Sequence, residues 1–500
     1  MKTRPFAASV VVAVAITVSA QDDPHAPAEP SLLRSILELD WPDVDAEREA
    51  LRHQILDAQP DSNLDPVDAW IWLSWRSLRI QGYLLGAIDS SVAVQEWIAQ
   101  NPERHDRDLF LYECPAELRD EQARILASVF NSEEWSELSE MAEEPSFLAP
   151  WGPTTGRVVG HTPFDSRTTL NALLKHAANA HDFEHLNECV RAIFAVARAV
   201  RSSGDFISTV VAYNGTGRVF DHAIFLSRAA KPEWDEDLRK LAGLIRAYEP
   251  LPPEIWIKGE RIYMHEYFMD AYGDFRSTET DLAAWIAEHG EDSMKRFEAT
   301  LNATLREMSQ DDVFGLALIP SPSLELESIN QLNNLAQIAL GDNPDAARDA
   351  RSQIERISNE DFENEIWTGK RPVVAMTSMS WPPAIGTSML ISAHRDAALT
   401  TNALARYRIA NESYPESLDD LTPHYLKALP IDPYDGQTLR YRRAISDDGE
   451  DYILYSVGCD GVDDGGILHP SHWSRAATDS RRKADSGTGY DIVFTAIEPY

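Results

Sequence analysis

The chain has 500 residues, a formal net charge of −36 and only three cysteines. This length suffices for about two to four domains of ordinary size, and an odd number of widely spaced cysteines excludes a disulfide framework. The negative charge argues against nucleic acids and anionic membrane surfaces as partners, because both carry charge of the same sign.

The first 20 residues have the layout of a secretory signal peptide. Lys2 and Arg4 precede an apolar run over residues 7–18, and small residues end at Ala20. The apolar run is shorter than the roughly 20 residues that cross a bilayer as a helix. We therefore expect cleavage after Ala20 and a linker over residues 21–30. The mature chain would be exported to the periplasm or cell envelope, or secreted, without a membrane span.

Residues 31–384 are predicted to form a mainly helical domain. Asp65 is placed to cap a helix that opens with Pro66 and continues over residues 69–88. Residues 167–201 carry two apolar faces separated by a polar turn, which predicts a helical hairpin. Further helices are expected at 207–226, 233–247, 280–309, 324–340 and 343–356.

Three tryptophans lie close together in the first of these helices. Trp70, Trp72 and Trp75 cannot share one narrow helical stripe, so the helix is either buried on two sides or lines a groove. Because large aromatic side chains more often fill a core than form a ligand platform, we expect core packing.

The sequence pattern changes after Pro383. A helix over about 385–410 is followed by short alternating segments at 437–443, 451–457 and 491–496, which are separated by Asp-Gly turns. This order predicts a small α+β domain over residues 385–500, with one long helix and a three-stranded antiparallel sheet.

The motifs of this last domain follow a distinctive order. They are Tyr414-Pro415, Leu421-Thr422-Pro423, Pro430-Ile431-Asp432-Pro433, Asp435-Gly436 and Tyr455-Ser456-Val457-Gly458. In this order the domain resembles the globular head of the type II secretion major pseudopilin, protein G. The chain departs from that family in its ordinary signal peptide and in an insertion over 467–489. As a whole it resembles uncharacterised exported helical proteins, especially those of planctomycetes.

The resemblance to protein G implies a calcium ion in the loop before the last strand. The candidate metal ligands at the matching positions are Ser456, Asp460, Asp463, Asp464 and Asp491. Calcium is a hard cation that takes six to eight oxygen ligands, and closely spaced Asp and Gly residues can turn the backbone around it. The same Asp-Gly pairs are also typical of hairpin turns, so the residues alone leave both interpretations open.

Residues 181–185 match the H-x-x-E-H pattern of inverted zinc peptidases. That chemistry needs His181 and His185 on one face of one helix. Asp182 is a natural N-cap, which would leave His181 before the helix begins, so a polar turn is the preferred interpretation. Acidic pairs beside aromatic residues could serve a glycosidase, but a chain with 81 acidic residues contains such pairs by chance.

The sequence therefore favours an exported, non-catalytic protein with an interaction or scaffold role at the cell envelope, a calcium-stabilised pseudopilin-like head and an unidentified protein partner. The alternative is an exported hydrolase, a metallopeptidase or glycosidase, with its active site in the helical domain. A deep cleft with converging carboxylates, or zinc at His181 and His185, would favour the hydrolase.

Overall fold

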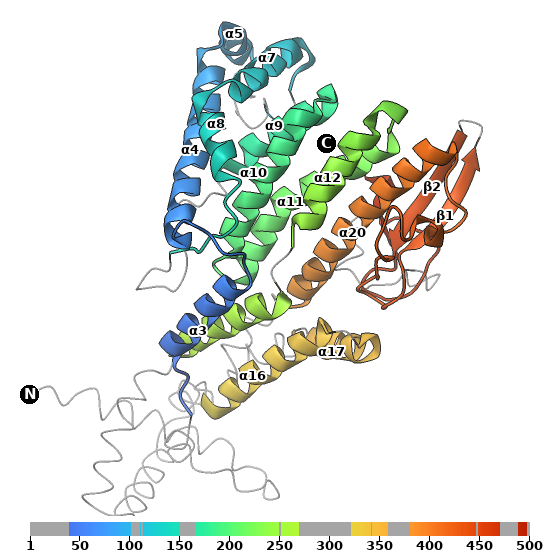
Figure 1. Cartoon of the computed structure of the whole chain (residues 1–500). Coiled ribbons are helices and arrows are strands. Elements are labelled where there is room, and N and C mark those ends of the chain that lie inside the picture. Colours follow the sequence, from blue (N-terminus) through green and yellow to red (C-terminus); the bar gives the residue numbers. More distant parts are fainter. Residues whose placement is uncertain are drawn as a thin grey trace, which may run out of the picture. The chain divides into compact units, whose positions relative to one another are not determined.

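The computed structural model describes residues 40–101, 111, 114–150, 166–249, 252–269, 322–341, 343–358, 381–446, 449–470 and 489–497. The predicted signal peptide, the linker and the helix expected at 280–309 lie outside these residues. The described chain is mainly helical and has a small antiparallel sheet near its C-terminal end, which confirms the predicted fold class at this level (Figure 1). None of the described helices is both long and apolar enough to cross a membrane.

The chain forms two compact units, and both are discontinuous in sequence. Unit 1 comprises residues 1–49, 257–341 and 349–383, and unit 2 comprises residues 50–256, 342–348 and 384–500. Unit 2 therefore combines most of the predicted helical domain with the predicted C-terminal domain.

Unit 1 is held together by polar contacts between segments far apart in sequence. The Nδ1 atom of His265 lies 3.0 Å from Glu47 Oε2, and Arg48 Nε donates to Glu266 Oε1 at 2.9 Å. Asn333 Nδ2 donates to the carbonyl of Ile257 at 3.0 Å. These contacts involve α3 (Val44–Asp57), the helix at 253–269 and α16 (Pro322–Ala339), which α17 (Pro344–Arg356) follows.

Unit 2 begins with a long helix whose start was predicted. The side chain of Asp65 caps α4 (Pro66–Ser90) by accepting hydrogen bonds from the backbone of Val67 and Asp68. Helix α4 packs against α7 and α8. The neighbouring helices are α5 (Val92–Gln100), α7 (Arg119–Phe130) and α8 (Glu133–Met141).

The expected core packing of the three tryptophans is correct for only one of them. Trp70 is buried, and its indole nitrogen donates to the carbonyl of Ala199 at 3.0 Å. Trp72 and Trp75 are 51% and 58% exposed. Because each helical residue turns by about 100°, Trp72 points away from the face that Trp70 buries.

The predicted helical hairpin is present. It consists of α9 (Arg167–Ala180) and α10 (Phe183–Arg201). Two residues, His181 and Asp182, form the turn between them. His181 takes a left-handed conformation with φ of 56° and ends α9, whereas Asp182 caps α10 through the backbone amide of His185. The apolar face of α10 then packs against the next helix in the chain.

The helix α20 (Trp381–Asn411) starts earlier than predicted. Pro382 and Pro383 lie in its first turn, where proline is tolerated because its missing N–H would have no helical partner. Figure 1 shows α20 between α12 and the sheet. Asn402 Nδ2 donates to the carbonyl of Leu238 at 2.9 Å, which fastens α20 to α12. The preceding helices are α11 (Phe206–Arg228) and α12 (Asp235–Ala247).

The three-stranded antiparallel sheet is confirmed, with the order β1-β2-β3. The third strand is shorter than predicted, because the chain turns into a 3-10 helix at Phe494. The contacts that attach the sheet domain to α20 include the Tyr434 hydroxyl, which donates to the carbonyl of Gly386 at 3.0 Å, and the stacked rings of His394 and Phe494. The elements are β1 (Arg440–Ser446), β2 (Gly449–Ser456), β3 (Ile492–Val493) and η8 (Phe494–Ala496).

Candidate functional site

The five predicted calcium ligands all lie at one end of the sheet, in a segment that we call the Asp-rich loop (residues 456–468 and 489–491). Ser456 is completely buried and its hydroxyl donates to Asp432 Oδ1 at 2.9 Å. Asp432 also accepts hydrogen bonds from the backbone of Tyr434 and Val457, at 3.1 and 3.0 Å. Ser456 is therefore engaged by a carboxylate that we did not predict as a site residue.

Asp491 uses its carboxylate to hold the loop's own backbone. Its Oδ2 atom accepts from the amides of Gly466 and Ile467 at 2.7 and 3.1 Å, and its Oδ1 atom accepts from the amide of Asp464 at 3.4 Å. Burial raises the pKa of Asp491 to about 6, although these hydrogen bonds oppose the shift. The side chain acts as an internal brace for the turn.

Of the remaining three aspartates, Asp460 and Asp464 lie close together, whereas Asp463 is directed elsewhere. A Cβ atom placed on Gly489 would lie 2.0 Å from Asp460 Oδ2 and 2.9 Å from Asp464 Oδ2, so these two carboxylates converge on one point. Asp463 accepts instead from the Tyr455 hydroxyl at 2.9 Å and lies 3.6 Å from Arg440 Nε.

The structure thus brings Asp460 and Asp464 together but directs Ser456 and Asp463 elsewhere. Among the described residues, no group of three or more His, Cys, Asp or Glu side chains is arranged to hold a metal ion. Asp464 Oδ2 accepts a hydrogen bond from the amide of Gly489 at 3.0 Å, and the full set of five does not form one coordination shell.

The H-x-x-E-H segment does not assemble a zinc site. His181 ends α9 and its ring lies 4.6 Å from the ring of Trp234, whereas His185 belongs to α10 and stacks on Phe130 at 4.3 Å. The Nδ1 atom of His185 lies 2.7 Å from Asp182 Oδ2. The two histidines therefore lie on different helices and contact different aromatic residues, as the polar-turn interpretation requires.

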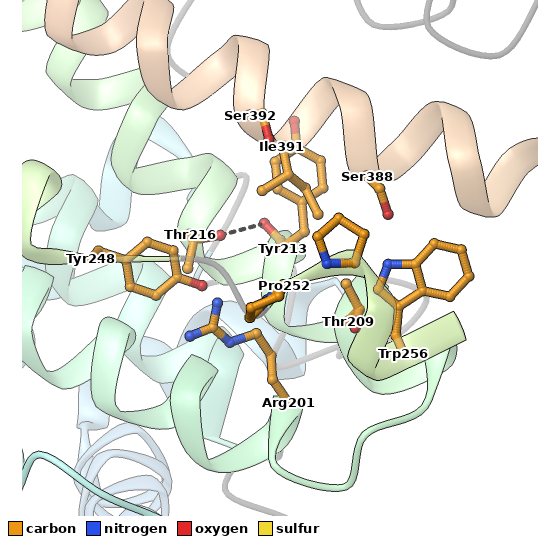
Figure 2. Close-up of a pocket in the computed structure, with 11 residues that line it drawn as sticks. Arg201, Thr209, Tyr213, Thr216, Tyr248, Pro252, Trp256, Ser388, Ile391 and Ser392 are labelled. Atoms are coloured by element: carbon orange, nitrogen blue, oxygen red, sulfur yellow. Dashed lines mark hydrogen bonds between the residues drawn. The ribbon is translucent and has the colours of Figure 1, made fainter. Parts of the chain in front are cut away.

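A pocket of about 110 Å³ lies elsewhere in unit 2, and sequence reasoning did not identify it (Figure 2). Arg201 and Tyr248 lie on the side opposite α20. The buried floor includes Thr216 and Trp256, and more exposed residues surround the opening. The lining residues are Arg201, Thr209, Tyr213, Thr216, Tyr248, Pro252, Pro253, Trp256, Ser388, Ile391 and Ser392.

The turn after α10 places Arg201 at the pocket floor. Gly204 has φ of 78°, and a Cβ atom there would lie 3.0 Å from the side chain of Ile55, so glycine suits this close approach. Asp205 then caps α11 through the amide of Ser208. Arg201 occupies the last turn of α10, where the helix dipole favours a positive charge.

Arg201 is a buried cation without a counterion. It is 5% exposed, and its Nη2 atom donates to the carbonyl of Glu249 at 3.0 Å. Its guanidinium carbon lies 4.8 Å from the centre of the Tyr248 ring. The Nε and Nη1 atoms have no hydrogen-bond partner, and no carboxylate among the described residues forms an ion pair with this side chain.

Burial lowers the pKa of Arg201, and the neighbouring Arg198 shows the same effect, with a pKa lowered to about 10. Arg198 differs because it is turned away from the pocket lining and reaches the carbonyls of Ala142 and Glu144. An arginine stays charged at physiological pH even so. Arg201 therefore brings a permanent positive charge to the pocket.

Hydroxyl groups and apolar surfaces complete the pocket. Ser388 Oγ is buried and has no hydrogen-bond partner, whereas Thr216 Oγ1 donates to the carbonyl of Tyr213 at 3.4 Å (Figure 2). Trp256 and Ile391 are buried and supply apolar surface. No lining residue carries a carboxylate. A cation, an unsatisfied hydroxyl and apolar walls together suit a small anion.

One signal in the sequence could have pointed to Arg201. It lies four residues after Ala197 and eight after Ile193, on the apolar face of α10. A charged residue at such a position must find a partner in the interior. The other walls of the pocket include Tyr248, Ser388 and Ser392, which lie 47 to 191 positions further along the chain, and nothing in the local pattern links them to Arg201.

No protein-family model, curated protein or solved structure matches this chain.

Proposed function

We propose that this protein is an exported, non-catalytic binding protein whose pocket receives a small organic anion. The observation that carries this proposal is the buried Arg201, which lines the pocket with two nitrogens unpaired and no carboxylate beside it. The pseudopilin-like head of residues 385–500 forms one wall of the pocket through α20 and would relay its occupancy to a protein partner.

The free-energy cost of burying the charge of Arg201 supports an anionic ligand. Taking a charge out of water costs several kcal/mol when no partner compensates it. An incoming carboxylate would accept a charge-assisted hydrogen bond from the guanidinium and so recover part of that cost. The overall charge of −36 repels large polyanions, because they contact much of the acidic surface. A small anion that binds at one buried cation is repelled less.

The size of the pocket limits the ligand. Its volume of about 110 Å³ is smaller than the ~150 Å³ engineered cavity that holds benzene, a ring of six carbon atoms. The ligand class is therefore a short monocarboxylate with on the order of five or six non-hydrogen atoms. Trp256 and Ile391 would contact its apolar part, and Ser388 would accept or donate a hydrogen bond.

The position of α20 gives the head a physical connection to the pocket. Ser388, Ile391 and Ser392 lie on the pocket side of this helix. Gly386, half a turn earlier, accepts a hydrogen bond from Tyr434 of the head. A shift of α20 on ligand binding would therefore move contacts that position the sheet domain, which supports a role in ligand-dependent interaction.

The hydrolase alternative has no comparable support in the described residues. The lining of the Arg201 pocket contains no carboxylate, and neither does that of a second, smaller pocket beside Arg167 and Gly215. A glycosidase needs two carboxylates across a cleft, and the two histidines of the zinc motif are on different helices.

The proposal is tested by calorimetric titration of the full chain with acetate, propionate and the neutral analogue propionamide. We expect the two carboxylates to bind and the amide to bind at least tenfold more weakly, because only a carboxylate compensates Arg201. Arg201→Gln should remove the preference, whereas the exposed control Arg239→Gln should retain it. Equal binding of propionate and propionamide, or retention of the preference in Arg201→Gln, would contradict the proposal.

A further inference from the structure

A chain of polar side chains leads from the pocket wall into the interior of unit 2. Tyr213 of α11 lines the pocket, and its hydroxyl lies 3.0 Å from His394 Nδ1. On the other side of the imidazole, His394 Nε2 lies 3.2 Å from Asp221 Oδ1, which is an ion-pair distance without hydrogen-bond geometry. His394 is completely buried and Asp221 is 7% exposed. The chain therefore joins a ligand pocket to a buried histidine and carboxylate.

The protonation of His394 determines which way the Tyr213 hydroxyl can donate. A phenol has one proton to donate, and a neutral imidazole has one donor and one acceptor nitrogen. When the imidazole carries its proton on Nε2, facing Asp221, its Nδ1 atom accepts the Tyr213 hydroxyl. When the imidazole is protonated on both nitrogens, Nδ1 donates a hydrogen bond to the Tyr213 oxygen. The Tyr213 hydroxyl can then donate its own hydrogen bond to another acceptor.

We propose that the pocket takes up its anion together with a proton, which is held on His394 between Tyr213 and Asp221. This inference rests on the proposed function, because it concerns the same pocket. A bound carboxylate favours the imidazolium in two ways: it accepts a hydrogen bond from the Tyr213 hydroxyl, and its negative charge stabilises the positive ring. The affinity for the anion therefore increases as the pH falls.

Tyr213, the pocket residue that contacts His394, keeps its own proton. Burial and the charge of Asp221 raise the pKa of Tyr213 well above its ordinary value, so the phenol stays neutral. The carboxylate of Asp221 lies 3.2 Å from the His394 ring, and Arg218 lies 3.7 Å from Asp221.

The remaining described neighbours of His394 include one further proton site near pH 6, the carboxyl of Asp396. His222, next to Asp221 on α11, has a pKa lowered to about 4, chiefly by burial, and stays neutral. Phe494 of η8 stacks on His394 and adds no charge. On α20 itself, Arg395 donates to the carbonyl of Ile245, and burial raises the pKa of Asp396 to about 6.

The experiment is a calorimetric titration of the full chain with propionate in Bis-Tris and in Tris, two buffers that differ in ionisation enthalpy and offer no competing carboxylate. The difference in observed heat gives the number of protons taken up per bound anion. Repeating the titration between about pH 5 and pH 8, where histidine titrates, should show a maximum uptake close to one proton.

The variant Tyr213→Phe keeps the ring but removes the connection to His394. It should still bind propionate through Arg201, about tenfold more weakly, and with proton uptake reduced to less than half of the wild-type value. The matched control Tyr263→Phe, which removes an exposed hydroxyl in unit 1, should change neither quantity. His394→Gln should bind with an affinity that no longer depends on pH over this range.

Three outcomes decide between the two proposals. Propionate binding without proton uptake in the wild type would overturn the proton-coupled mechanism and leave the proposed function intact. Unchanged proton uptake in Tyr213→Phe would overturn the assignment to this chain of residues. The absence of any preference for propionate over propionamide would overturn both.

Discussion

The Arg201 pocket and the Asp-rich loop are two charged regions of unit 2, and they use charge in opposite ways. In the loop, Asp491 accepts three backbone hydrogen bonds and Asp463 bonds to Tyr455 and Gly465. In the pocket, one arginine keeps two nitrogens unpaired. A high density of charged residues can thus be structural, whereas a single buried charge without an oppositely charged partner indicates a ligand.

The largest expected effect concerns Asp432, the fully buried carboxylate at the base of the loop. Replacing Asp432 with Ala would leave the amides of Tyr434 and Val457 and the hydroxyl of Ser456 without an acceptor. Each buried group left unpaired costs about 1–3 kcal/mol, so we expect a loss of at least ~3 kcal/mol in the free energy of unfolding, measured by urea denaturation. The control Asp345→Ala, at an exposed position, should have no measurable effect.

The opposite result is expected for Arg201→Met. This change removes an uncompensated charge and keeps most of the side-chain volume, and such replacements are often neutral or stabilising by about 1–4 kcal/mol. The unliganded variant should therefore unfold at an equal or higher urea concentration than the wild type, and it should no longer bind propionate. A destabilised variant that still binds would show that Arg201 is structural, like the aspartates of the loop.

The pH dependence of stability separates the two regions further. Burial raises the pKa of both Asp432 and Asp491 to about 6, so each carboxyl binds a proton more tightly in the folded chain than in the unfolded chain. The folded state then holds more protons between about pH 4 and pH 6, and the contribution of these groups to stability falls as the pH rises through that window.

The measurement is thermal melting of the wild type and of Asp491→Asn at several pH values across this window. Asn keeps an acceptor for the amides of Gly466 and Ile467 but does not titrate. The advantage of Asp491→Asn over the wild type should therefore grow as the pH rises from about 4 to about 6. A difference between the two proteins that does not change with pH would show that the Asp491 pKa is not raised.

Calcium should have the smallest effect. Asp460 and Asp464 converge on Gly489 and are the ligands that we propose for the ion. Exported calcium sites often bind with dissociation constants of about 10⁻⁴–10⁻³ M, so a few millimolar calcium would stabilise the head by roughly 1–2 kcal/mol.

This effect is measured as a rise in melting temperature when calcium is added after chelation. Asp464→Asn should abolish the rise. Asp463→Asn should retain it, because Asp463 is directed towards Tyr455 and Arg440. If Asp463→Asn instead abolished the rise in melting temperature, the predicted set of five ligands would be favoured over the pair of Asp460 and Asp464.

Local sequence signals were sufficient for most of the secondary structure. Asp65 and Pro66 marked the start of α4, Asp182 marked the turn of the helical hairpin, and alternating residues marked the strands. These features depend on capping and on side-chain periodicity, which act over a few residues. The mainly helical fold with a small antiparallel sheet could therefore be predicted from the sequence.

The burial and hydrogen bonding of individual side chains were less predictable from the sequence. Trp70 and Trp72 are of the same type and lie two residues apart, yet only Trp70 is buried. Ser456 and Asp463 match the calcium motif, yet they bond to Asp432 and Tyr455. Burial and bonding depend on which distant segments pack against each face, and a local motif does not contain that information.

The sequence by itself thus determined the helices, the hairpin, the sheet and the acidic character of the chain, because these follow from local capping, periodicity and composition. Only the tertiary structure decided that Arg201, Tyr213 and Ser388 line one pocket and that His394 bonds to Tyr213. These residues come from α10, α11 and α20, and only the packing of the helices in three dimensions brings them together.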